Sequence, residues 1–316
     1  MLSVDHLYTQ KSVKGTRNGA IYGILKNLCT MLNMAEFKGY FPVYCFDRGI
    51  NPRRKSVYTD YKNKDVAYTD VEKMKLKDDY ITQYRTQRNE LIEVLSYMGI
   101  PSIIMENTEG DDIGNILCNM AEDVICITTD QDWLQNLSQD HVRVYNPIKK
   151  ILYTEEKYII ENNISSIEEF IIRKSILGDT SDNIPSCCKG IGEKSVGEFV
   201  KYLNIYKQDN KYNFENYERD EKKCKELCEQ NNVKYKKAYT NFIAEDYYRN
   251  EQLINLKYIT SEEKYTIESN IKSTIMLSQS TNNYINALKK LNQLGVMNID
   301  IDTIRREIMM RRKNIS

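Results

Sequence analysis

Apolar positions change between helix-like and strand-like spacing along the first half of the chain. Helical spacing predicts helices over residues 19–34, 79–99 and 111–121. Short apolar runs predict buried strands over residues 40–47, 100–106 and 123–130. Strands that alternate with helices are typical of an α/β fold, so we predict a mostly parallel central sheet flanked by helices.

The strand signal fades after Ser165, and the rest of the chain has a helical pattern. Residues 167–177 and 193–203 suit two helices on either side of a turn, and the last residues suit a short basic helix. Residues 204–246 are rich in Lys, Asn, Glu and Tyr and are interpreted as an insertion or a mobile helical segment. We therefore expect three regions, a core at 1–164, a helical region at 165–260 and a C-terminal helical segment at 261–316.

Composition excludes some classes of protein and leaves others open. The formal net charge is zero, yet residues 48–77 hold nine Lys or Arg against four acids. The eight cysteines form no C-x-x-C pair and only two histidines are present, which argues against a zinc site. We find no signal peptide or long apolar run, so we predict a protein with reduced thiols, located in the cytoplasm and not at a membrane.

Acidic side chains cluster where the predicted strands end. They are Asp47; Glu109, Asp111 and Asp112; Asp130 and Asp132; and, farther along, Asp179 and Asp182. Acids at the carboxyl ends of parallel strands meet at one edge of a sheet, where crowded carboxylates repel one another unless protonated or bound to a cation. Oxygen ligands favour Mg²⁺ or Mn²⁺. The alternative for any single acid is a helix cap, as at the start of the helix at 111–121.

Residues 177–196, LGDTSDNIPSCCKGIGEKSV, combine acids with a turn suited to phosphate. Asp179 and Asp182 are followed by a turn containing Gly190 and Gly192, just ahead of a helical pattern. A glycine turn that opens a helix offers free backbone N–H groups to a phosphate. Carboxylates for metal beside such a turn suggest an enzyme that acts on a phosphodiester backbone.

This stretch resembles the helix–three-turn–helix signature of the 5′-nuclease family, which includes flap endonucleases, 5′–3′ exonuclease domains of bacterial DNA polymerases and phage ribonuclease H enzymes. The resemblance covers roughly residues 15–203, and more weakly extends to about 260. It implies a PIN-like nuclease core and two divalent ions, Mg²⁺ or Mn²⁺, with a K⁺ ion in the signature turn. The family motifs FD, E-x-DD, T-x-D-x-D and GD-x-x-DN imply that the metal ligands are Asp47, Glu109, Asp111, Asp112, Asp130, Asp132, Asp179 and Asp182.

The segment YTDYKNK at 58–64 resembles the base of the family's helical arch, expected here over about 48–78. The resemblance implies a catalytic role for Lys62 together with Asp47, and base stacking by Tyr61. Contacts to DNA phosphates are expected from Arg53, Arg54, Lys55 and Lys64 in the arch and from Lys189, Gly190, Gly192 and Lys194 in the signature turn. The alternative for the arch is a solvated charged loop.

The family opens with a strand ending in aspartate, about 25 residues before the equivalent of Gly19. This chain offers Asp5, fourteen residues before Gly19, so we expect the strand to be missing, with Asp5 as the alternative ligand.

The function implied is a structure-specific 5′ nuclease that cuts 5′ flaps or removes RNA primers during replication or repair. Its partners would be branched or 5′-flap DNA, RNA–DNA hybrids and replication proteins, with the chain a monomer in a bacterium or a phage-infected cell. The alternatives are a DNA-junction-binding remnant without cleavage and an unrelated metal-dependent phosphatase.

Overall fold

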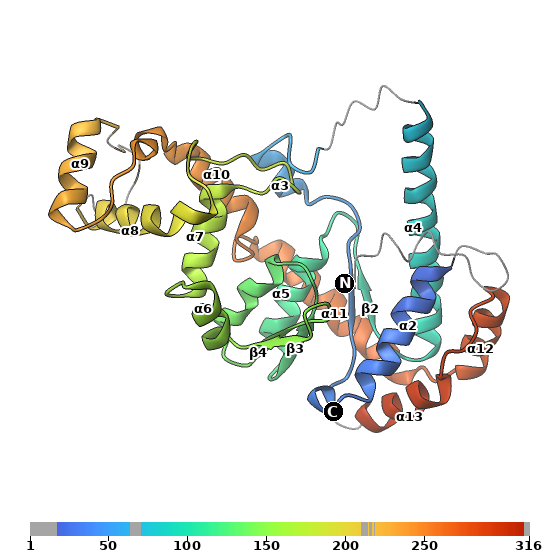
Figure 1. Cartoon of the computed structure of the whole chain (residues 1–316). Coiled ribbons are helices and arrows are strands. Elements are labelled where there is room, and N and C mark those ends of the chain that lie inside the picture. The colour runs from blue at the N-terminus through green and yellow to red at the C-terminus, as the bar shows by residue number, and fades with distance from the viewer. Residues whose placement is uncertain (1–17, 64–70, 210–213, 215–216, 218, 313–316) are drawn as a thin grey trace.

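The structure is a computed structural model that describes residues 18–63, 71–209, 214, 217 and 219–312 (Figure 1). The side chains of residues 71–80 lie outside this description, as do Asp5 and Lys64. In the described part of the chain, no helix combines the length and apolar character needed to span a bilayer.

The strands form two separate pieces of sheet. In the first piece, β1 (Tyr44–Phe46) runs parallel to β2 (Ser102–Ile104), with Cys45 opposite Ile103. In the second piece, β3 (Val124–Ile127) runs parallel to β4 (Val142–Asn146), and β5 (Ile151–Tyr153) is antiparallel to β4. The predicted parallel strands are present but are shorter than their apolar runs, and the sheet is interrupted between β1 and β3.

Helices cover both faces of the first piece of sheet. Phe46 packs with α2 (Gly19–Leu32) and α4 (Val71–Tyr97) on one face. Cys45 packs on the opposite face with α5 (Gly110–Met120) and α11 (Ser261–Ser280). Because successive strand residues point to opposite faces, both sides of this short strand are apolar, as in other buried parallel sheets.

The C-terminal helices belong to this core. Helix α11 packs on α5, α12 (Tyr284–Gln293) on α4, and α13 (Ile301–Arg311) on α2. Arg311 fixes the last helix, because its guanidinium donates to the backbone oxygens of Phe37, Tyr40 and Leu32. The described part of the segment predicted at 261–316 is helical, and it completes the apolar cover of the first sheet.

The second piece of sheet packs on its own cluster of apolar side chains. This cluster includes Cys126 and Val144 from the strands and Ile171 from α7 (Ile167–Leu177). The remaining short elements are η1 (Ala35–Phe37), α3 (Pro52–Val57), η2 (Asp132–Ser138) and α6 (Glu155–Asn162). Trp133 in η2 is half-buried against this cluster.

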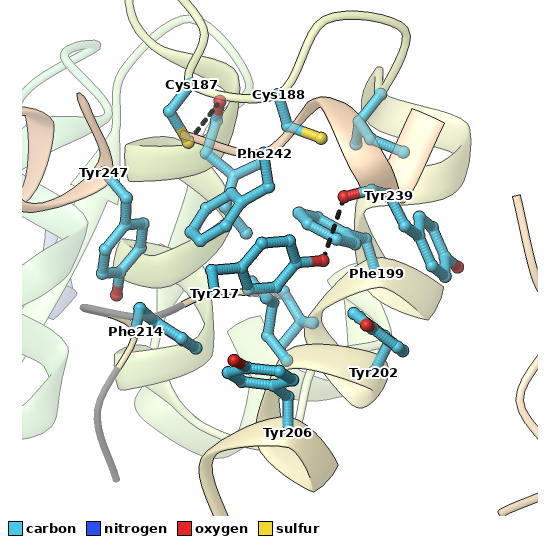
Figure 2. Close-up of a cluster of buried hydrophobic side chains, with 14 of the residues drawn as sticks. Cys187, Cys188, Phe199, Tyr202, Tyr206, Phe214, Tyr217, Tyr239, Phe242 and Tyr247 are labelled. Carbon is cyan, nitrogen blue, oxygen red and sulfur yellow. Dashed lines mark hydrogen bonds between the residues drawn. The ribbon is translucent and has the colours of Figure 1, made fainter. Parts of the chain in front are cut away.

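The predicted insertion forms a helical lobe with an aromatic core. The lobe contains α8 (Glu193–Asp209), α9 (Glu221–Gln230), η3 (Lys237–Asn241) and α10 (Ala244–Ile254). Figure 2 shows Tyr217 among Phe199, Tyr239 and Phe242, and its hydroxyl donates to the backbone oxygen of Tyr239 at 2.9 Å. Since Tyr239 and Phe242 are fully buried, this described part of 204–246 is packed in the same cluster as the signature turn.

Gly178, directly before Asp179, holds a backbone conformation that a side chain would disturb. Its φ is +74° with ψ −170°, a region that is almost exclusive to glycine. A Cβ at this position would lie 2.3 Å from the carbonyl oxygen of Ile184. The sharp turn from α7 into the acidic loop therefore requires glycine.

We predict that Gly178→Ala lowers the free energy of unfolding by about 1–3 kcal/mol, because it adds both backbone strain and a contact with rigid backbone. Urea unfolding followed by circular dichroism measures the change. Gly192→Ala is the matched control, since its added Cβ meets nothing within 4 Å. Equal unfolding midpoints for the two variants would contradict the requirement for glycine.

Candidate metal centre

Six of the predicted acids line one cavity of about 2130 Å³. Asp47 follows β1, Asp130 follows β3, and Asp111 lies in the first turn of α5. The other three are Asp132, Asp179 and Asp182. The sequence prediction that strand-end acids meet at one edge agrees with this arrangement, and the loop after α7 adds its own two acids.

Arg54 is buried among the acids of α5. Its guanidinium donates to both carboxylate oxygens of Asp112, at 2.9 and 2.8 Å, and lies 2.9 Å from Glu109 Oε2. The Arg54, Asp112 and Glu109 side chains are each 1% exposed. A paired, bidentate geometry is what makes such a buried charge tolerable.

Lys62 and Tyr61 approach the same group of acids from the arch. Lys62 Nζ donates to Glu109 Oε2 at 2.6 Å and lies 3.7 Å from Asp182 Oδ2. The Tyr61 hydroxyl donates to the same Glu109 oxygen at 2.9 Å. Glu109 thus holds the base of the arch against the start of α5.

Lys174 of α7 is a site residue that the sequence reasoning missed. Its amine pairs with Asp132 and lies 3.0 Å from Asp179 Oδ2, and it lines the same cavity. No motif identified it, since a lone lysine on a helix has no distinguishing signal. In the sequence, Lys174 is distinguished only by its position one helical turn before Gly178.

Several of these carboxyl groups have raised pKa values in the folded protein. Burial raises the pKa of Asp111 well above its ordinary value, and the neighbouring Asp112 and Glu109 charges add to the effect. Burial also raises the pKa of Asp132 and of Asp182, with further contributions from nearby acids. The site is therefore short of positive charge.

The protein's own cations offset part of this repulsion. Burial opposes the charge of Lys62 and Lys174, but nearby acids together outweigh it and raise the pKa of each amine: Glu109 and Asp182 for Lys62, Asp132 and Asp179 for Lys174. In the same way, Arg54 and Lys62 overcome burial and lower the pKa of Glu109. These pairs offset part of the negative charge, while the pKa values of Asp111, Asp132 and Asp182 stay raised.

The donor set suits a hard divalent cation, although protein cations stand among the ligands. Within the described residues, no three His, Cys, Asp or Glu side chains converge closely enough to hold a metal ion. The acids that line the cavity present carboxylate oxygens, which are the ligands that Mg²⁺ and Mn²⁺ prefer. Asp111, Asp130 and Asp132 on one side, and Asp179 and Asp182 on the other, are the residues that fit such ions.

Backbone hydrogen bonds join the arch to the acidic loop. The amide of Lys62, at φ +53°, donates to the carbonyl of Asp182 at 2.8 Å. The Asn183 side chain donates to the carbonyl of Asp60 at 2.8 Å. Residues 60–62 are therefore held against the acidic loop.

The predicted DNA contacts fall into two groups. Lys189, Gly190, Gly192 and Lys194 are exposed on the signature turn, so their roles stay predictions. Arg53 is half-buried beside Glu263, Lys55 donates to the Thr59 carbonyl, and Lys64 lies outside the described residues.

Two sequence predictions need correction, both because of partners distant in the sequence. Arg54 is 1% exposed with its guanidinium buried against Asp112, so it is not presented to a DNA phosphate. Tyr61 is 2% exposed, with its hydroxyl bonded to Glu109, so it offers no stacking surface to a base. Both oxygens of Asp112 accept from Arg54, and its role as a metal ligand stays a prediction.

We predict that Arg54→Met lowers the free energy of unfolding by about 3–5 kcal/mol, because Asp112 is left as a buried charge without its partner. Chemical denaturation measures the loss, and Arg54→Met/Asp112→Leu should recover much of it. The control is Arg48→Met, whose pair with Glu106 is exposed at 48% and 68%. An Arg54→Met variant as stable as Arg48→Met would show that the buried pair contributes nothing.

The chain is similar to proteins with known names. The chain is 31% identical over 192 residues to a DNA polymerase I from Streptococcus pneumoniae, which covers 58% of this chain and 20% of the relative. It is 29% identical over 197 residues to a 5′-3′ exonuclease from Buchnera aphidicola, covering 60% of this chain and 63% of that protein. The chain thus spans less than two thirds of the length of either relative.

Solved structures share the fold. A T5 5′-exonuclease with bound zinc aligns with a TM-score of 0.61 at 18% identity, over 87% of this chain and 94% of that one. A bacteriophage T5 flap endonuclease in complex with DNA and metal ions aligns with a TM-score of 0.57 at 21% identity, over 84% and 93%. These likenesses confirm the predicted fold class. The model for the 5′-3′ exonuclease N-terminal resolvase-like domain matches residues 4–164, half of the chain, and the chain therefore belongs to the 5′-3′ exonuclease family.

Proposed function

We propose that this chain is a divalent-metal-dependent, structure-specific 5′ nuclease. The observation that carries the proposal is the single cavity in which carboxylates from β1, β3, α5 and the loop after α7 face Lys62 and Lys174. Gly192 of the signature turn borders the same cavity, so a phosphate held by the turn would lie beside the acids.

Metal ions at this site would be held by carboxylates from two sides. Asp111, Asp130 and Asp132 would hold one ion, with Glu109 joining them only if Lys62 releases it. Asp179 and Asp182 would contribute to a second. Bound Mg²⁺ or Mn²⁺ would supply activation of water and neutralisation of the leaving oxygen. The fit rests on oxygen-donor chemistry and on the shared cavity.

The chain's own cations have separate roles in this proposal. Lys62, 30% exposed at the rim of the acids, would stabilise negative charge that develops on the scissile phosphate. Lys189 and Lys194, with the backbone of the turn at Gly190 and Gly192, would position the phosphate backbone without reading sequence. The potassium ion implied by the family resemblance would belong to this turn.

The substrate we propose is a 5′ flap or a primer strand at a branched junction. The names of the relatives and the DNA in the T5 complex support this substrate class. Action as a monomer, together with replication proteins, in the cytoplasm of a bacterium or a phage-infected cell, stays a prediction.

A second candidate function is junction binding without cleavage. It is favoured by one observation, that protein cations hold the described acids and no three of them converge on a metal geometry. A labelled 5′-flap substrate with Mg²⁺ separates the two functions, because binding without any product would support the second.

We predict that Lys62→Ala lowers the single-turnover cleavage rate by about 10²-fold or more, while flap affinity changes little, because its charge acts mainly in the transition state. Rapid-quench assays at saturating enzyme measure the rate, and titration measures affinity. Lys189→Ala is the comparison and should weaken binding and flatten its salt dependence by about one counterion. A Lys62→Ala variant with weaker binding but an unchanged saturating rate would make Lys62 a phosphate anchor only.

We further predict that Mn²⁺ binds this chain and that Asp132→Asn weakens its affinity by about tenfold or more, since a ligand is lost. Electron paramagnetic resonance of free Mn²⁺ measures binding without reference to catalysis. Asp140→Asn serves as the control, because Asp140 is an exposed loop acid outside the cavity. Equal Mn²⁺ affinity in both variants would remove Asp132 from the ligand set.

A further inference from the structure

Lys62 holds a backbone conformation that few residues with a side chain adopt. Its φ is +53°, in the left-handed region that glycine and asparagine usually occupy. It is the third residue of a tight turn, which is closed by the amide of Asn63 donating to the carbonyl of Asp60 at 2.9 Å. Such a conformation costs free energy and persists only where neighbouring contacts impose it. The loop after α7 supplies contacts of this kind.

The loop at residues 179–184 is closed by its own hydrogen bonds. Asp179 and Ile184 exchange two backbone hydrogen bonds, at 2.9 and 2.7 Å. The Asp179 carboxylate accepts from the amide of Ser181 at 2.7 Å. Ile184 also belongs to the apolar cluster that buries Tyr61. The loop therefore has a defined shape of its own and packs against the turn that contains Lys62.

Two further hydrogen bonds join this loop to the turn. The Lys62 amide donates to the Asp182 carbonyl at 2.8 Å. The Asn183 side chain donates to the Asp60 carbonyl, also at 2.8 Å. One bond therefore holds the first residue of the turn and the other holds the third. Together they oppose rotation of the turn as well as its separation from the loop.

Asparagine meets both requirements of its position in the loop. The φ of Asn183 is +59°, and asparagine tolerates the left-handed region better than most other residues with a side chain. Its carboxamide NH₂ group supplies the donor that the Asp60 carbonyl accepts. An ionised aspartate would tolerate the same conformation but has no hydrogen to donate. The residue type therefore matches the contact.

We propose that Asn183 is a positioning residue for Lys62, and that it acts by holding the turn against the acidic loop. This inference rests on the proposed function, in which the charge of Lys62 stabilises the scissile phosphate. The Asp182 carbonyl receives the Lys62 amide, and Asp182 Oδ2 lies 3.7 Å from Lys62 Nζ. The amine and the acids of the loop are thereby kept in one arrangement, which stabilisation of a transition state by a preorganised charge requires.

Hydrogen exchange tests the contact without reference to catalysis. In Asn183→Gly, glycine accepts the backbone conformation but removes the donor. Because the turn is then held less firmly, we expect exchange in the peptide that contains Tyr61 and Lys62 to quicken by about two- to tenfold, the change expected for one hydrogen bond. Asn163→Gly is the matched control, since Asn163 is an exposed asparagine at φ +48° that ends α6.

Single-turnover cleavage of a 5′-flap substrate at saturating enzyme tests the positioning role. Asn183→Gly should lower the rate by about two- to tenfold with little change in flap affinity. In a Lys62→Ala background the same change should have almost no effect, because the amine that Asn183 positions is absent. Asn163→Gly should leave the rate unchanged in both backgrounds.

Unchanged exchange in Asn183→Gly would overturn the contact and the proposal with it. A rate loss of equal size with and without the Lys62 amine would overturn the positioning role, since Asn183 would then act on the loop alone. If the unaltered chain cleaves no flap with Mg²⁺, the proposed function and the positioning role fail together. Faster exchange in Asn183→Gly would still show in that case that Asn183 holds the turn.

Discussion

Repulsion between crowded carboxylates is the constraint on which the rest of this structure depends. Asp111, Asp132 and Asp182 share one cavity, and burial already disfavours their charged forms. Such a group is stable only with nearby positive charge. Arg54 and Lys62 supply that charge from the arch side, and Lys174 supplies it from α7.

These ion pairs also determine which segments are held together. Arg54 ties α3 to the start of α5, and Asn51 extends the link to α11 by donating to Glu263 at 3.0 Å. Lys174 ties α7 to the turn after β3 through Asp132. The same contacts therefore offset the charge of the acids and hold these segments of the fold together. A cation bound by Asp132 or Glu109 would compete with Lys174 or Lys62 for the same oxygens, and these contacts also hold α7 and residue 62 in place.

Local pattern was sufficient for the first three strands and for the placement of the acids that follow them. Residues 124–127 form a strand within the predicted run at 123–130, and the acids after it line the cavity, because apolar runs and strand-end position are local properties. The strands β4 and β5 were missed, since they have only five and three residues and short runs give a weak pattern. Arg54 and Tyr61 were misinterpreted for a different reason. A basic, aromatic segment has the same composition whether it faces DNA or buried acids, and only the tertiary partners Asp112 and Glu109 distinguish the two. The role of Lys174 could not be predicted from the sequence for the same reason, because it depends on the turn after α7 that brings Asp179 next to it.

The interruption of the sheet and the crowding of the acids have a common geometric origin. With no described strand between β1 and β3, the cavity runs from the apolar faces of α2 and α5 to the carboxylates at the strand ends. The acids on the β1 side and those on the β3 side are then held in relation to each other mainly by α5, which contacts both β1 and η2. A strand paired to both edges would fix the two halves through backbone hydrogen bonds, whose geometry is far stricter than that of a single packed helix. The continuity of the sheet therefore bears on how precisely the carboxylates are arranged, and the ion pairs of Arg54, Lys62 and Lys174 offset part of their mutual repulsion.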